Sequence, residues 1–156
     1  MTDVNPPTGA CSPSVRGIFV ANLVAQTAIL VTGAVVRLTG SGLGCPTWPE
    51  CVDGSIAPTS TQAESWHKYV EFGNRLLTFA VGIIAILALI AVIIYTVRRV
   101  RSGAPIRYSI LLLGLAPLVG TFAQAVLGGI TVLTGLHPAT VASHFLLSMA
   151  IIAGVV

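Results

Sequence analysis

Apolar residues form four long stretches along the chain, and short polar segments separate them. The stretches cover roughly residues 17–36, 72–97, 108–134 and 138–156. A transmembrane helix needs about 20 predominantly apolar residues to cross the hydrocarbon core of a bilayer. The pattern therefore predicts an all-α integral membrane protein with four transmembrane helices.

The composition agrees with this prediction. Of the 156 residues, 54% are hydrophobic and 8% are charged, and the mean hydropathy is +0.92. Soluble domains carry about 25% charged residues, so the composition excludes a water-soluble enzyme. The net charge of +3 indicates no nucleic-acid partner, because no basic patch is interleaved with aromatic residues.

Basic residues predict the orientation in the membrane, because lysine and arginine concentrate on the cytoplasmic side. The densest basic cluster lies between the second and third stretches and consists of Arg98, Arg99, Arg101 and Arg107. We therefore predict a cytoplasmic loop at 98–107, a cytoplasmic tail at 1–16 and an outer loop at 38–71. Arg37 and Lys68 fall on the outer side against this rule, which makes them candidates for a function there.

The two ends of the chain carry further expectations. A secretory signal is the alternative for the first stretch, but its polar leader and its apolar run of about 20 residues exceed the usual dimensions. Gly42 stands where a lipoprotein cleavage site before Cys45 would need leucine. The last stretch reaches Val156 without the interfacial anchor residues that normally end a membrane helix. We therefore expect the natural protein to continue beyond this residue.

Two pairs of segments within the chain resemble each other. They are GAVVRLTG at 33–40 with GGITVLTG at 128–135, and NRLLTFA at 74–80 with HFLLSMA at 144–150. Chance similarity is the alternative for either pair alone, because membrane helices use few residue types. Two matches in the same order predict two similar helical hairpins that pack as a four-helix bundle, with Asn74 and His144 at equivalent positions.

His144 is the strongest candidate for chemistry, because an ionisable residue inside a membrane is costly and is usually functional. Imidazole is among the commonest metal ligands, and an iron porphyrin suits a single histidine in an apolar helical bundle. The alternative is a histidine ring that is hydrogen-bonded to a neighbouring carbonyl group. We predict that His144 is the metal ligand of a bound haem.

A second group of candidates shares one face at the start of the second helix. Glu71 lies three residues before Asn74 and four before Arg75, a spacing that makes helical neighbours. Glu71 could move protons at the haem edge, and an ordinary ion pair with Arg75 is the alternative. Arg37 and Arg75 suit the two carboxylates of a haem. For either arginine, the alternative is that its side chain extends to the lipid headgroups.

Cys45 and Cys51 flank the sequence PTWPE in the predicted outer loop. An oxidising exterior favours a disulfide between them, although their spacing is wider than the C-x-x-C of thiol oxidoreductases. A structural disulfide and a redox function both stay open. Cys11 falls on the predicted reducing side, and we expect it to be inert. The chain contains no pattern of a zinc site, a phosphate loop or a Ser-His-Asp arrangement.

Three segments together resemble the haem A synthase family of the bacterial type, in a form similar to that of actinobacteria. They are TGAVVRLTGSGL at 32–43, CPTWPEC at 45–51 and EFGNR at 71–75, and the similarity extends through 128–135 to His144. The resemblance implies an eight-helix protein of two four-helix halves, of which this chain is the N-terminal half. It implies an enzyme that oxidises a ring methyl group of haem O to the formyl group of haem A for cytochrome oxidase assembly. Haem O would bind in this half and a haem b in the C-terminal half.

The resemblance also implies roles for individual residues. Glu71 matches the essential, catalytic glutamate of the family, and His144 matches its haem ligand on the fourth helix. Cys45 and Cys51 match its outer cysteine pair, which implies a disulfide.

Asn74 departs from the family pattern, which usually has histidine at this position. Asparagine is a poor iron ligand, so we expect a haem that His144 alone holds. Asn74 would then orient water or oxygen at the other face of the iron. His67 or His137 reaching the iron is the alternative.

The expected partners are haem O and membrane lipid, with haem O synthase, an electron donor and a second copy of the chain as further candidates. The expected location is the bacterial cell membrane. Two other functions stay open: a non-catalytic haem-binding electron-transfer subunit, and a membrane thiol oxidoreductase.

Overall fold

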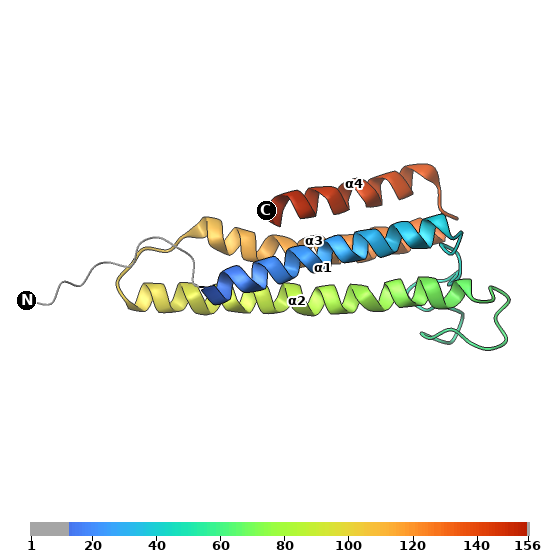
Figure 1. Cartoon of the computed structure of the whole chain (residues 1–156), viewed down its shortest axis with the longest axis horizontal. Helices are drawn as coiled ribbons and strands as arrows, with labels where there is room; N and C mark the ends of the chain where they lie inside the picture. The colour runs from blue at the N-terminus through green and yellow to red at the C-terminus, as the bar shows by residue number, and fades with distance from the viewer. Residues whose placement is uncertain (1–12, 156) are drawn as a thin grey trace, which may run out of the picture.

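Four long helices make up most of the computed structural model, which describes residues 13–155 (Figure 1). They are α1 (Pro13–Leu38), α2 (His67–Arg101), α3 (Tyr108–Leu133) and α4 (Pro138–Val155). Each helix contains one of the apolar stretches, so the prediction of an all-α fold with four helices is confirmed. The first three are long and apolar enough to cross a membrane, and α4 is apolar but shorter.

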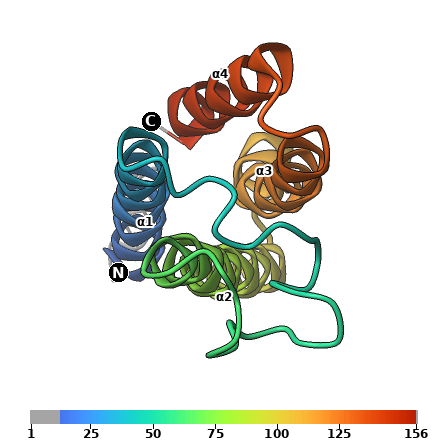
Figure 2. The same ribbon diagram turned by 90° about the vertical axis from the view of Figure 1, so that its right-hand side faces the viewer.

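The helices follow one another around the bundle in chain order, as the view along its axis shows (Figure 2). Consecutive helices pack side by side, and α4 closes the ring by a weaker contact with α1. Helices α1 and α2 form one hairpin, and helices α3 and α4 form the second. This is the arrangement that the repeated segments predict.

Both ends of α2 differ from the prediction. It begins at His67, so the predicted outer loop at 38–71 is too long at its end. Helix α2 continues to Arg101, so Arg98, Arg99 and Arg101 lie on its last turn and the connection to α3 covers only residues 102–107. The predicted loop at 98–107 is therefore too long. Arginine is a good helix former, and its charge is favourable beside the C-terminal end of a helix, so the helix outlasts its apolar stretch.

The N-terminal boundary also lies earlier than the apolar pattern indicates. Helix α1 begins at Pro13, within the predicted tail at 1–16. Proline is common at the first helical position because its missing N–H would have no helical partner there. Residues 1–12, including Cys11, lie outside the described part of the chain.

Small side chains pack α2 closely against α3 in the half of the bundle away from the segment at 39–66. Ala85, Ala88 and Val92 on α2 are completely buried. A Cβ atom on Gly114 of α3 would come within 3.0 Å of the Val92 side chain, so glycine permits this approach. The opposite half of the bundle encloses open space that residues of all four helices line, and the segment at 39–66 crosses its end (Figure 2). We refer to that end as the loop end.

Candidate functional site

A cavity of about 700 Å³ lies between the four helices toward the loop end. Its volume falls in the range of about 300–1,000 Å³ that is usual for ligand sites. Most of its wall is aliphatic, with side chains such as Ile29, Leu30, Val36, Val81, Val132 and Val141. The candidates Arg37, Glu71, Asn74, Arg75 and His144 all line it. The structure therefore brings the predicted site residues of three helices to one cavity.

His144 reaches the cavity from α4, and its ring makes no hydrogen bond within the described part of the chain. Its Nδ1 atom is buried and has no partner, so the alternative of a ring tied to a carbonyl group is not what the structure contains. The ring packs on the backbone of α3, because a Cβ atom on Gly128 would come within 3.2 Å of His144 Cε1. A side chain held in this way is suited to receive a ligand.

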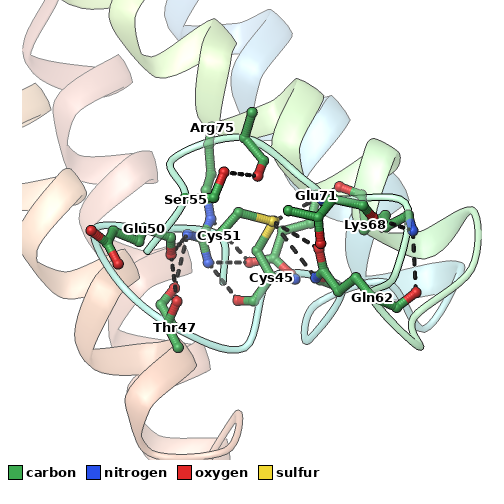
Figure 3. Close-up of a disulfide and its surroundings, with 12 residues drawn as sticks. Cys45, Thr47, Glu50, Cys51, Ser55, Gln62, Lys68, Glu71 and Arg75 are labelled. Atoms are coloured by element: carbon green, nitrogen blue, oxygen red, sulfur yellow. Dashed lines mark hydrogen bonds and ion pairs between the residues drawn. A yellow bond between two sulfur atoms is a disulfide. The ribbon is translucent and has the colours of Figure 1, made fainter. Parts of the chain in front are cut away.

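Glu71 is buried where α2 meets the loop, and three donors surround its carboxylate (Figure 3). The Cys45 N–H donates to Oε2 over 2.8 Å. Arg75 donates to Oε1 from Nε over 3.2 Å and from Nη2 over 2.6 Å. The ion pair between Glu71 and Arg75 is therefore present, and it also fixes the start of the disulfide loop.

Arg75 connects α2 to the backbone of the loop (Figure 3). Its Nη1 donates to the carbonyl oxygens of Thr47 and Glu50 over 2.9 and 3.0 Å, and its Nη2 donates to that of Cys45 over 2.7 Å. A guanidinium group has five N–H bonds, and with the two to Glu71 all five donate within the protein. Arg75 therefore has no donor left for a haem carboxylate in this arrangement.

Arg37 also lines the cavity, but unlike Arg75 it is exposed and its side chain is not tied to the described part of the protein. It stands on the last turn of α1. Its side chain makes no hydrogen bond or ion pair with the residues that the structure describes. Arg37 is thus the arginine whose guanidinium group is available to an anionic ligand.

Asn74 lines the same cavity from α2, which lies across the bundle from α4 and its His144 (Figure 2). Its Oδ1 atom accepts a hydrogen bond of 2.7 Å from Thr32 Oγ1 on α1, which leaves its amide nitrogen to donate. His67 and His137 do not line the cavity. His67 bonds to Ser41 over 2.9 Å, and exposed His137 accepts from the Ala139 N–H over 3.3 Å.

Cys45 and Cys51 form the predicted disulfide, with an S–S distance of 2.05 Å (Figure 3). Both cysteines have an exposed fraction of 0%. Thiol exchange requires that a thiolate reaches one of the sulfur atoms, and burial blocks this access. The disulfide therefore acts as a structural cross-link beside Glu71. The structure does not favour the alternative function of a thiol oxidoreductase.

Four polar residues that the sequence did not single out line the cavity at its end away from the loop, which we call the deep end. They are Gln26 on α1, Thr121 and Gln124 on α3, and Ser148 on α4. Gln26 Nε2 donates to Thr121 Oγ1 over 2.9 Å, and Gln124 contacts Ser148. The same rule that selected His144, a polar group inside an apolar stretch, could have found both glutamines.

The donor set fits an iron porphyrin better than a bare metal ion. The described residues contain no group of three His, Cys, Asp or Glu side chains that could hold a metal. A porphyrin supplies most iron ligands itself and takes a single axial histidine from a protein. The unpaired ring of His144, an aliphatic wall and an available arginine at the edge meet this requirement.

These features define a multi-pass helical membrane protein with a ligand-sized cavity between its helices. Residues 16–156 match the family of cytochrome oxidase assembly proteins (COX15-CtaA), and the chain belongs to that family.

Curated relatives in this family carry the name Heme A synthase. The chain is 36% identical to the protein of Lysinibacillus sphaericus over 137 residues, which cover 87% of this chain and 41% of the relative. It is 28% identical to the protein of Bacillus licheniformis over 143 residues, which cover 91% of this chain and 43% of the relative. The chain thus spans about two fifths of the length of these relatives.

Proposed function

We propose that this chain forms the haem O-binding part of a haem A synthase, which oxidises a ring methyl group of haem O to the formyl group of haem A. The observation that carries the proposal is the unpaired ring of His144 in a largely aliphatic cavity of about 700 Å³. The relatives named Heme A synthase support it. In this proposal a haem b binds in a further, C-terminal part of the protein.

The residues of the chain have separate roles in this proposal. The iron porphyrin is the substrate and also supplies the redox chemistry, so the protein binds it, orients it and handles protons. His144 holds the iron, and Arg37 pairs with a carboxylate at the porphyrin edge. Asn74, whose amide nitrogen is left to donate by the Thr32 bond to Oδ1, would orient a small molecule beside the bound haem. Glu71 is the catalytic carboxylate at the cavity wall.

The orientation is also part of the proposal. The loop end faces outward and the arginine-rich end of α2 faces the cytoplasm of a bacterial cell, because basic residues favour that side. Haem O, membrane lipid, haem O synthase and an electron donor are the proposed partners.

Replacing the proposed iron ligand tests the binding role. We expect His144→Ala to lose the haem absorption band that arises at this site, because no other histidine lines the cavity. The measurement is the haem content and spectrum of the purified full-length variant. His137→Ala is the matched control, since His137 is exposed and outside the cavity. An unchanged spectrum in His144→Ala would end the proposal.

Replacing the buried carboxylate tests the catalytic role. We expect Glu71→Gln to retain haem and to lower the rate of methyl oxidation by about 100-fold or more, the usual contribution of a proton-transfer group. Mass analysis of extracted haem measures the conversion of haem O. Glu50→Gln is the control, because the Glu50 side chain binds Gly54 N–H away from the cavity. Full turnover in Glu71→Gln would remove this residue from the mechanism.

The same haem extraction separates the synthase from an electron-transfer subunit. Only a synthase contains haem O, a hydroxylated intermediate or haem A among its extracted porphyrins. Haem b alone, in cells that produce haem O, would favour the electron-transfer subunit.

A further inference from the structure

Trp48 lines the cavity from the middle of the disulfide loop at 45–51. It is 40% exposed, although its ring also contacts α3. A tryptophan side chain offers a large, flat apolar surface for contact with another aromatic group. The way in which the protein holds this ring shows which part of it is open to a ligand.

One face of the Trp48 ring lies on the backbone of α3. A Cβ atom on Gly129 would come within 2.5 Å of Trp48 Cδ2, 2.7 Å of Cε2 and 2.9 Å of Cγ. Cδ2 is a ring-fusion carbon without a free edge, so an atom this close to it must lie over the ring face. Trp48 thus covers Gly129, which is buried and does not line the cavity. The ring surface that lines the cavity therefore belongs to the other face and the edge.

Two consecutive glycines of α3 place Trp48 and His144 at the same depth in the cavity. The His144 ring packs on Gly128, and the Trp48 ring packs on Gly129. Consecutive residues of a helix differ by about 1.5 Å along its axis. The two rings therefore reach α3 at nearly the same level, His144 from α4 and Trp48 from the loop. A ligand that His144 holds lies at the level of Trp48.

The internal repeat shows that the second glycine is particular to α3. Gly128 and Gly129 correspond to Gly33 and Ala34 on α1. Ala34 is exposed and lines the cavity with its own side chain. At the equivalent position of α3, a Cβ atom would collide with Trp48, so glycine is required for the ring to lie there.

The backbone on both sides of Trp48 is fixed before any ligand binds. Arg75 Nη1 donates to the carbonyl oxygens of Thr47 and Glu50 over 2.9 and 3.0 Å (Figure 3). Thr47 Oγ1 donates to the same Glu50 carbonyl over 2.9 Å, and the disulfide closes the loop. A side chain on a fixed backbone loses less conformational freedom when it contacts a ligand.

We infer that the face of Trp48 turned away from Gly129 packs against the bound porphyrin. The inference rests on the proposed function and adds to it a binding residue that the outer loop supplies. A porphyrin is a large, flat aromatic ring, and contact between aromatic rings is favourable beyond the apolar area that it buries. The disulfide and Arg75 then contribute to ligand binding through the position of Trp48.

Replacing the ring tests the contact. Iron protoporphyrin is titrated into the full-length protein in detergent, and the absorption change that is absent in His144→Ala isolates this cavity. We expect Trp48→Leu to weaken this binding by about tenfold, and Trp48→Phe, which keeps an aromatic ring, by about threefold or less. Trp66→Leu is the matched control and should bind as the native protein does. Trp66 is exposed, stacks on His67 and does not line the cavity.

Gly129→Ala tests the same contact from the helix side. Its added Cβ atom should displace the Trp48 ring and weaken binding by about tenfold in the otherwise native chain. In Trp48→Leu, which has no ring over Gly129, the same substitution should change the affinity by less than about twofold. Equal losses in the two backgrounds would show that ring position does not determine binding, and would overturn the inference.

A footprinting measurement on the native protein does not depend on the folding of any variant. Trp48 and Trp66 are 40% and 51% exposed, so hydroxyl radicals should oxidise both in the ligand-free protein. Saturation with zinc protoporphyrin, whose metal takes one axial ligand, should protect Trp48 and leave Trp66 unchanged. Mass spectrometry of the peptides measures both oxidation rates.

The outcomes separate this inference from the proposed function. Equal oxidation of Trp48 with and without the porphyrin, or native affinity in Trp48→Leu, would overturn the inference and leave the haem site intact. No His144-dependent absorption change in the native protein would defeat the proposed function itself.

Discussion

Arg37 and Arg75 have the same side chain but different surroundings in the structure. Both suit haem carboxylates when only the sequence is known. All five donors of Arg75 bind Glu71 and the loop carbonyl groups, whereas Arg37 has no partner among the described residues. Long-range pairing of this kind depends on how the loop folds onto α2, and the spacing of residues along the chain does not contain that information.

Matched glutamine substitutions separate the two arginines. We expect Arg37→Gln to weaken haem binding about fivefold, the effect of one exposed charge-assisted contact, and to leave stability unchanged. Arg75→Gln should lower the free energy of unfolding by about 3 kcal/mol, because it leaves buried Glu71 without its charge partner. Haem titration and thermal melting of both variants measure this. The reverse pattern would show that Arg75 is the ligand-binding arginine.

The chemistry-bearing residues could be selected from the sequence because so few polar groups occur in the apolar stretches. His144 was found in this way, Asn74 by its place in the repeat and Glu71 by its spacing from Arg75, and the three line one cavity. Gln124 was not selected, although it is a polar residue inside an apolar stretch. The hydrogen bonds to His144 and Ser148 show that its amide nitrogen is used, and its Oε1 atom has no partner within the described part of the chain.

At the scale of helices, the apolar stretches predicted the centre of each helix correctly and the position of some helix ends incorrectly. Helix α2 extends from His67 to Arg101, although its apolar stretch covers 72–97. Hydropathy reports what a membrane accepts, whereas a helix ends where its backbone loses hydrogen-bond partners. At Arg101 the Ser102 N–H still donates to Arg98 and Arg99, which closes the last turn.

Gly128 lies where α3 packs against the His144 side chain of α4, and we predict that enlarging this residue weakens haem binding. An added Cβ atom would come within 3.2 Å of His144 Cε1, so Gly128→Ala should displace the ring and weaken haem binding about fivefold to tenfold. Gly73→Ala on α2 is the control, since a Cβ atom there meets nothing within 4 Å. Haem titration of both variants provides the comparison, and equal affinity for the two would show that ring placement does not depend on this contact.

For the whole molecule, the order of helices and the hairpin repeat were both predictable, because the repeat places equivalent segments in the same order. The cavity was not predictable. It depends on how closely α2 packs against α3 through Val92 and Gly114, and on how loosely α4 meets α1. Packing density of this kind is a property of the assembled bundle.

The proposed orientation can be tested with single cysteines at exposed serines on opposite ends of the bundle. In protein with Cys11 replaced by serine, Ser60→Cys should react with a membrane-impermeant maleimide on intact cells. Ser102→Cys should react only after the cells are made permeable. Labelling in the opposite order would reverse the orientation.

The order of the helices around the ring also bears on how the protein is made. Each helix packs against the one before it, so α1, α2 and α3 can associate while the chain is still being synthesised. His144, Ser148 and Phe145 arrive only with α4, and they complete the cavity wall. Haem binding at the proposed site would therefore have to follow the insertion of α4, and a ribosome stalled before α4 would leave three helices without a complete cavity wall.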